Sequence, residues 1–145
     1  MRIEQLKKVE DIRDALQRYN GSATRKLTDR VGSLELYADK LFRYAENYVM
    51  FQDNTEIGFF SFYANDMISK RAYLAIIAID VQHQRKGNGG RALQFIIDEC
   101  HTKQMESLRL EVDKMNGNAL RFYKRNGFLI VEEASDVSVI MEREI

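Results

Sequence analysis

The chain has 145 residues, 45% of them hydrophobic and 30% charged, which predicts one globular domain over residues 1–145 with a core of its own. Basic and acidic residues number 22 each, so no overall field favours nucleic acid or an anionic membrane, and we expect neither as a partner. A single cysteine excludes an internal disulfide, the two histidines lack the spacing of a metal site, and no signal peptide or long apolar span appears, so we expect a cytoplasmic protein without a metal.

The first third of the chain predicts mainly helices. A short strand is expected over residues 1–6, and apolar residues then recur at helical spacing over 9–19. Residues 21–32 are polar and irregular, which predicts a loop that borders a substrate site. A second helical stripe runs from 34 to 48.

The middle of the chain predicts strands. Three strand-like runs, 48–52, 57–64 and 72–79, are joined by short turns, which favours an antiparallel meander. The run from Tyr73 to Ile79 is apolar at every position, as expected for a central strand that is covered on both faces.

The last third alternates between helix and strand. The stripe over 89–100 predicts a helix that buries Cys100, and alternation over 108–112 predicts a half-buried strand. A short helix should end at Asn126-Gly127, and residues 128–141 should close the fold as a hairpin. We therefore predict the α+β class, with a mixed central sheet of about six or seven strands flanked by helices.

A basic, glycine-rich turn separates the predicted central strand from the next helix. Its glycines allow the backbone to approach a ligand, and the unpaired amides of the turn and of the first helical turn attract anions. Three cations add full charges around these amides. The segment comprises Gln84, Arg85, Lys86, Gly87, Asn88, Gly89, Gly90 and Arg91. A pyrophosphate fits such a turn.

Other interpretations of the turn are weaker. No Lys-Ser or Lys-Thr follows the glycines, as a Walker A loop requires. A dinucleotide fingerprint is nearly matched, with Ala92 at its third glycine position, but that motif usually opens its domain. The glycines could also serve the geometry of the turn alone.

A second set of residues follows within a short distance. It consists of Leu110-Glu111-Val112, Asn116, Ala119, Phe122-Tyr123 and Gly127-Phe128. Each has an ordinary structural explanation by itself, such as Asn116 as a helix N-cap and Gly127 as a helix stop. Their order after a phosphate-type turn is what gives them a functional meaning.

Together these two segments resemble the GNAT family of N-acetyltransferases. The turn is similar to the family motif Gln/Arg-x-x-Gly-x-Gly/Ala over residues 84–89. The later segment is similar to Asn-x-x-Ala-x-x-x-Tyr…Gly-Phe over residues 116–128. Val81, Arg85 and Asn88 depart from the residues that the family commonly has there, but they leave the strand end and the amides intact. The resemblance covers about residues 34–143.

The resemblance implies acetyl-CoA as the acetyl donor. Its pyrophosphate would bind the amides from Arg85 to Arg91, and its pantetheine arm would pair with the backbone at Ile79 and Val81. Asn116 would hydrogen bond to the same arm, and Tyr123 would stand near the sulfur.

Acetyl transfer to an amine needs a base for the amine and an acid for the thiolate. Tyr123 suits the acid, because its ordinary pKa of about 10 keeps it protonated. Glu111 is the candidate base, in an arrangement that resembles the ribosomal-protein N-terminal acetyltransferases. Alternatively, Glu111 is a surface carboxylate paired with Arg109 or Lys114. His83 is the next candidate base.

The sequence thus predicts an acetyl-CoA-dependent N-acetyltransferase that acts on a small-molecule or peptide amine. A non-catalytic acyl-CoA-binding module is one alternative, and a toxin-type acetyltransferase acting on aminoacyl-tRNA is another. The acceptor should be shaped by residues 21–31, the helix from Leu34 and the acidic hairpin 132–136. The family likeness also allows a homodimer.

Overall fold

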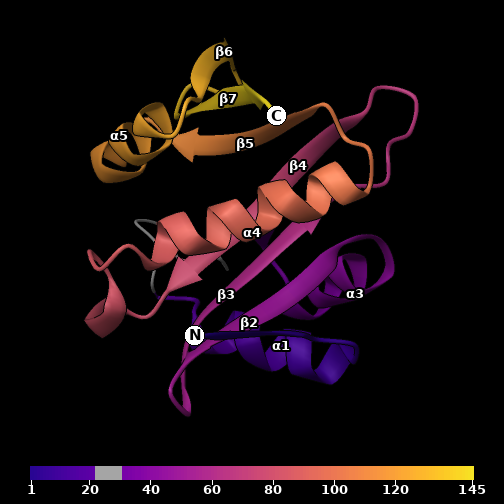
Figure 1. The fold of residues 1–145 in the computed structure, drawn as a ribbon, viewed down its shortest axis with the longest axis vertical. Coiled ribbons are helices and arrows are strands. Elements are labelled where there is room, and N and C mark those ends of the chain that lie inside the picture. The colour runs from indigo at the N-terminus through magenta and orange to yellow at the C-terminus, as the bar shows by residue number, and fades with distance from the viewer. Residues whose placement is uncertain (22–30) are drawn as a thin grey trace.

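The computed structural model describes residues 1–21 and 31–145. Its centre is a seven-stranded sheet of order β1-β2-β3-β4-β5-β7-β6 (Figure 1). The elements are β1 (Arg2–Gln5), α1 (Val9–Arg18), α3 (Leu34–Tyr44), β2 (Glu46–Gln52), β3 (Thr55–Tyr63), β4 (Arg71–Ile79), the 3-10 helix η1 (Val81–His83), α4 (Asn88–Thr102), β5 (Ser107–Asp113), α5 (Gly117–Arg125), β6 (Leu129–Glu133) and β7 (Ser138–Glu144). The predicted α+β fold with a mixed sheet is confirmed.

The sheet is antiparallel except for one parallel pair of strands. Strands β1 to β4 form the predicted antiparallel meander, and β4 then pairs with β5 in parallel after the crossover through α4. β5 pairs antiparallel with β7, and β7 pairs with β6 at the edge, so the predicted closing hairpin is also present. None of the helices in the described ranges is long and apolar enough to cross a membrane.

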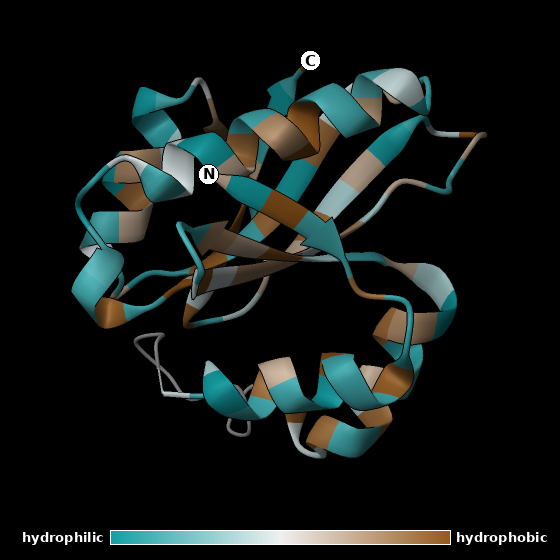
Figure 2. Ribbon diagram, turned by 60° about the horizontal axis from the view of Figure 1, so that its bottom comes forward, coloured by the Kyte–Doolittle hydropathy of each residue, from teal (hydrophilic) through white to brown (hydrophobic). Residues whose placement is uncertain are grey.

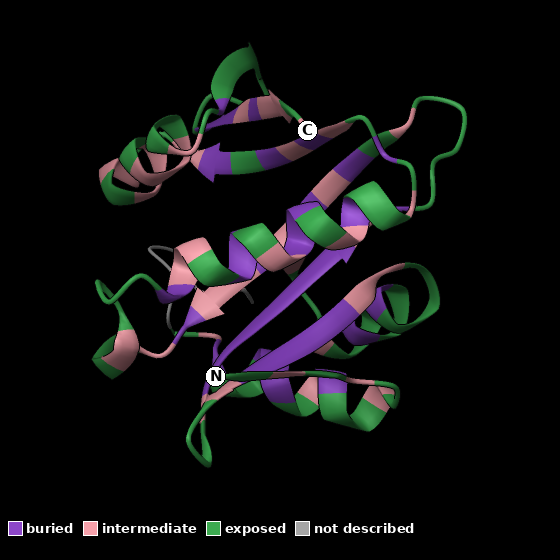
Figure 3. Cartoon of the chain, viewed as in Figure 1, coloured by how far each residue is buried: buried purple, intermediate pink, exposed green. Residues whose placement is uncertain are grey.

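Helices cover the two faces of the sheet. One apolar cluster lies between the sheet and α4 and includes Leu93, Ile96 and the predicted buried thiol of Cys100. A second cluster lies between the other face and the pair α1 and α3. Figure 2 shows this layering, and Figure 3 shows β2 and β3 as the most deeply buried strands.

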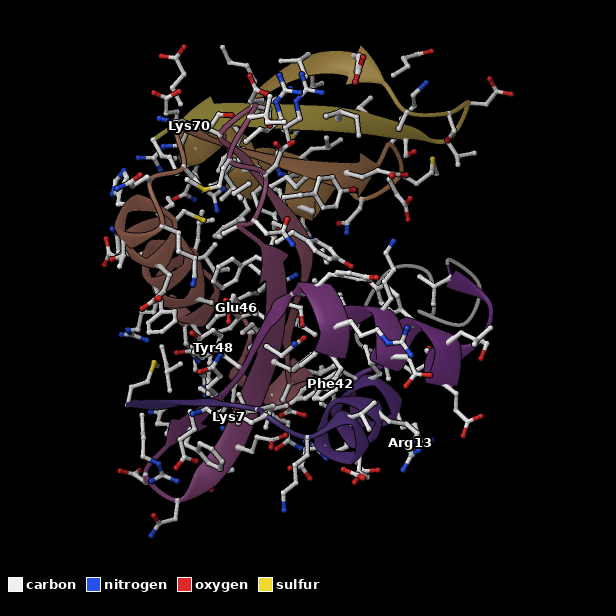
Figure 4. All side chains as sticks on the ribbon, turned by 90° about the vertical axis from the view of Figure 1, so that its right-hand side faces the viewer. Lys7, Arg13, Phe42, Glu46, Tyr48 and Lys70 are labelled. Carbon is white, nitrogen blue, oxygen red and sulfur yellow. The ribbon has the colours of Figure 1, made fainter. Side chains whose placement is uncertain are left out.

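The boundary between α3 and β2 differs from the prediction. The helix ends at Tyr44, and Tyr48 belongs to the strand, where it stacks on Phe60 at 5.3 Å and meets Phe95 of α4 edge-on at 4.9 Å. Figure 4 shows Tyr48 beside Glu46 on this strand. The side-chain amide of Asn47 donates to two carbonyls at the end of α3, at 3.0 and 3.2 Å, which stabilises the helix stop.

β4 contains an irregularity that the sequence pattern hides. Opposite β3, Ser61 pairs with Ile76 and Phe62 pairs with Leu74, so Ala75 is an extra residue in β4. Such a bulge reverses the faces of the residues that follow. Leu74 before the bulge and Ile79 after it both contribute to the cluster against α4. The expectation of full cover on both faces is wrong, because Tyr73, Ala75, Ile77 and Ala78 are only half-buried.

Candidate active site

A cleft opens between β4 and β5. The two strands pair only from Arg71 to Leu74 against Ser107 to Leu110. Beyond these pairs the strands diverge (Figure 1), and a cavity of about 730 Å³ lies between them. Its walls are the end of β4, the glycine-rich turn, the end of β5 and α5.

The end of β4 presents backbone hydrogen-bonding groups to this cleft. The amide of Asp80 donates to the carbonyl of Ile57 on β3 at 2.8 Å. Because antiparallel partners alternate, the N–H and C=O groups of Ile77 and Ile79 point away from β3 and toward the gap. The carbonyl of Ile79 accepts a hydrogen bond from the side chain of Gln84 at 2.9 Å. An extended ligand could pair with the remaining groups as an added strand.

The glycine-rich turn presents amides at the same end of the cleft. Arg85 and Gly87 adopt positive φ values of 63° and 83°, and α4 begins directly after Gly87. The first bond of this helix runs from the amide of Arg91 to the carbonyl of Gly87, at 3.1 Å. The amides of the preceding three residues therefore have no partner within the helix, and they carry the positive end of its dipole. This arrangement fits a pyrophosphate.

The side chains of Asn88 and Arg91 form hydrogen bonds within the protein instead of lining the cleft. Asn88 is 2% exposed and donates to the carbonyl of His83 at 2.9 Å. Arg91 donates to the side-chain oxygen of Asn88 at 2.8 Å. Asn88, one of the residues that depart from the family pattern, therefore links the turn to α4.

The cleft gathers most of the predicted binding residues, but not all of them. Those that line it are Ile79, Gln84, Arg85, Gly87, Gly89, Gly90 and Asn116. Val81, Lys86, Asn88 and Arg91 are outside its lining, and the side chain of Val81 is 67% exposed.

α5 forms the wall opposite β4. Asn116 caps this helix, because its side-chain oxygen accepts from the amide of Ala119 at 3.1 Å. Its side-chain NH₂ makes no hydrogen bond within the described part of the chain. The ring of Tyr123 packs edge-on against Phe122 and Phe128, with centroids 5.0 and 5.5 Å away. Tyr123 lines the cleft from this wall.

Glu111 lines the cleft from β5. Its carboxylate accepts a hydrogen bond from Ser138 at 2.7 Å. Glu111 is exposed, as a surface carboxylate would be, but the alternative pairing with Arg109 or Lys114 is wrong: these cations pair with Glu142 and Glu133, respectively. The two predicted catalytic side chains therefore face one cavity.

The other candidate base is placed differently. Nδ1 of His83 lies 3.0 Å from the carboxylate of Asp80, and His83 does not line the cleft. The described residues contain no group of His, Cys, Asp and Glu side chains that could hold a metal ion.

The sequence analysis missed several residues of the cleft. Tyr19, at the end of the apolar stripe over 9–19, lines the cleft. It donates its hydroxyl to Glu56 at 2.9 Å, and burial together with this carboxylate raises the Tyr19 pKa. Arg121 and Arg125 line the cleft from α5, where their spacing of four residues was an available signal.

Two predicted acceptor elements give different outcomes. Most of the predicted loop, residues 22–30, lies outside the described residues. In the predicted acidic hairpin, Glu132 pairs with Arg109 at 3.2 Å and Glu133 pairs with Lys114 at 2.7 Å. The ion pair with Lys114 lowers the pKa of Glu133.

The sequence matches the Acetyltransferase (GNAT) family over residues 9–128. The chain belongs to this family. A curated relative, the [ribosomal protein bS18]-alanine N-acetyltransferase of Escherichia coli K12, is 32% identical over 83 residues. That match spans 57% of this chain and 56% of the relative, so it covers little more than half of either.

Solved GNAT structures share the whole fold. The ribosomal-protein-S18-alanine N-acetyltransferase of E. coli superimposes with a TM-score of 0.78 at 23% identity, over 99% of this chain and 93% of that one. The PaiA N-acetyltransferase of Thermoplasma acidophilum, in complex with coenzyme A, gives 0.74 at 22% identity over the full length of both chains. At these identities the likeness shows the fold alone.

Proposed function

We propose that this GNAT protein transfers the acetyl group of acetyl-CoA to the primary amine of a peptide or protein. The observation that carries the proposal is the single cleft that Glu111 of β5 and Tyr123 of α5 both line, with the glycine-rich turn at its end. The similarity to bS18-alanine N-acetyltransferases supports a peptide N-terminus as the acceptor.

Binding of the donor would use the backbone more than the side chains. The pyrophosphate would lie on the amides of the glycine-rich turn, near the charge of Arg85. The pantetheine arm would lie along β4, where Ile77 and Ile79 offer backbone groups. The NH₂ of Asn116 would reach the same arm from α5.

The chemistry requires one bond to form and one to break. The amine nitrogen attacks the thioester carbon, and the C–S bond then breaks. A peptide α-amine has an ordinary pKa of about 8, so a base is useful at neutral pH. Glu111 would accept the amine proton, and Tyr123 would give a proton to the departing thiolate. A backbone amide of β4 that faces the gap would stabilise the carbonyl oxygen.

A direct assay tests the proposal. Thiol release from acetyl-CoA should depend on an added amine, in a panel of peptide N-termini, polyamines and sugar amines. Tyr123→Phe keeps the ring and its packing, so donor binding should survive while kcat falls by about 10²- to 10⁴-fold. Equal kcat of the two proteins, with chemistry rate-limiting, would remove the acid assignment. Donor binding without turnover on any amine would favour a non-catalytic acyl-CoA-binding module.

A further inference from the structure

The carboxylate of Glu111 ends a chain of serine hydroxyls. Ser138, which is fully buried on β7, donates to Oε2 of Glu111 at 2.7 Å, and the hydroxyl of Ser135 lies 2.9 Å from that of Ser138. A hydroxyl has one hydrogen to donate. Because Ser138 gives its hydrogen to the carboxylate, Ser135 donates to Ser138. The series of hydrogen bonds thus runs from the β6–β7 turn through Ser138 to Glu111.

This arrangement leaves one carboxylate oxygen for chemistry. Oε1 of Glu111 has no hydrogen-bond partner within the described part of the chain, whereas Oε2 is anchored. β5 and β7 hold Ser138 diagonally across from Glu111, two residues along β7, since Ser138 pairs with Asp113 and Glu111 pairs with Ile140. Such diagonal neighbours on a sheet are within reach of each other.

We propose that Ser138 is a positioning residue for the acetyl transfer, which holds the Glu111 carboxylate turned so that Oε1 can accept the proton of the amine. The inference rests on the proposed role of Glu111 as the base. Without the bond from Ser138 the exposed carboxylate would turn more freely, so Oε1 would face the amine in fewer molecules.

Other titratable and charged groups lie near Glu111. Those that share its face of the sheet or line its cleft are Arg109, Asp113, Glu142, Glu132, Tyr73, Tyr123, Tyr19, Arg85, Arg121 and Arg125. Arg109 is neutralised by Glu142 and Glu132, and these carboxylates raise its pKa. The bond from Ser138 is the one hydrogen bond that the Glu111 side chain receives in the described part of the chain.

The test is a steady-state assay that separates kcat from KM. Ser138→Ala should lower kcat by up to about tenfold and leave the KM for acetyl-CoA unchanged, and Ser135→Ala should lower kcat less. Ser107→Ala is the matched control, because Ser107 shares the same face of β5 and makes no side-chain hydrogen bond to Glu111. Its kcat should equal that of the wild type, and thermal melting should confirm that all variants fold.

A double substitution separates the inference from the proposed function. In a Glu111→Gln protein the base should be lost, and adding Ser138→Ala should then lower kcat no further. If Glu111→Gln lowers kcat but Ser138→Ala alone leaves kcat unchanged, the positioning role is refuted and the base stands. If Glu111→Gln leaves kcat unchanged, the base assignment and the positioning role both fail.

Discussion

Replacing Gly58 with alanine should destabilise the wall of the cleft. Gly58 is buried on β3 opposite Ile79, and a methyl group there would lie 2.9 Å from Cδ1 of Ile79 and 3.0 Å from the carbonyl oxygen of Ala78. The side chain of Ile79 can turn away, but the carbonyl oxygen moves only if β4 moves. In Gly58→Ala, the cost of overpacking against this oxygen therefore opposes the gain from a less flexible unfolded chain.

The overpacking should win. Extra volume in a packed core costs about 1–3 kcal/mol, whereas replacing glycine with alanine gains about 0.4–1 kcal/mol from the unfolded chain. We expect a net loss of about 1–2 kcal/mol in the free energy of unfolding. For a domain of this size, that loss lowers Tm by about 3–6 °C.

Calorimetry and urea unfolding of the free protein measure this change. Gly90→Ala is the control, because a methyl group at Gly90 meets nothing within 4 Å and should stabilise α4 by about 0.5–1 kcal/mol. A Gly58→Ala protein that is as stable as the wild type would refute the reasoning. It would mean that the end of β4 can shift to accommodate the methyl group with no loss in the free energy of unfolding.

Further predictions concern the turn and the titrating groups. Gly89→Asp should abolish the rise in Tm that CoA causes, because it adds an anion where the pyrophosphate would bind. The control Asn54→Asp, which adds the same charge in an exposed turn, should keep the rise. A normal rise in Gly89→Asp would contradict the assignment of the turn. Asn88→Leu should lower the free energy of unfolding by about 1–3 kcal/mol, measured in urea, because two part-buried hydrogen bonds are lost. Burial raises the pKa of Cys100 and of Tyr48 to about 12 each. As the pH rises, the unfolded chain loses these protons first, so the free energy of unfolding should fall between about pH 9 and 12. Cys100→Ala should reduce this fall in thermal melts measured over that pH range.

The sequence was sufficient for the order of elements and for most of the residues that line the cleft. Apolar periodicity located the strands and helices, and Gly87, whose φ of 83° suits few other residue types, marked the turn before α4. The inward role of Asn88 could not be predicted, since its partners are set by how the turn folds back on itself. The partner of Glu111 could not be predicted either, because Ser138 reaches it only through the pairing of β5 with β7.

The bulge at Ala75 explains why the cleft lies where it does. The last pair between β4 and β5 joins Leu74 to Leu110, so the extra residue comes immediately after it. A bulge increases the local twist of its strand, which turns the end of β4 away from β5. The change of faces keeps Ile79 in the core against α4, while the backbone of the same segment turns to the gap. A strand that is apolar at every position can turn either set of alternate residues toward the core, so its composition conceals the bulge at the point where the sheet opens.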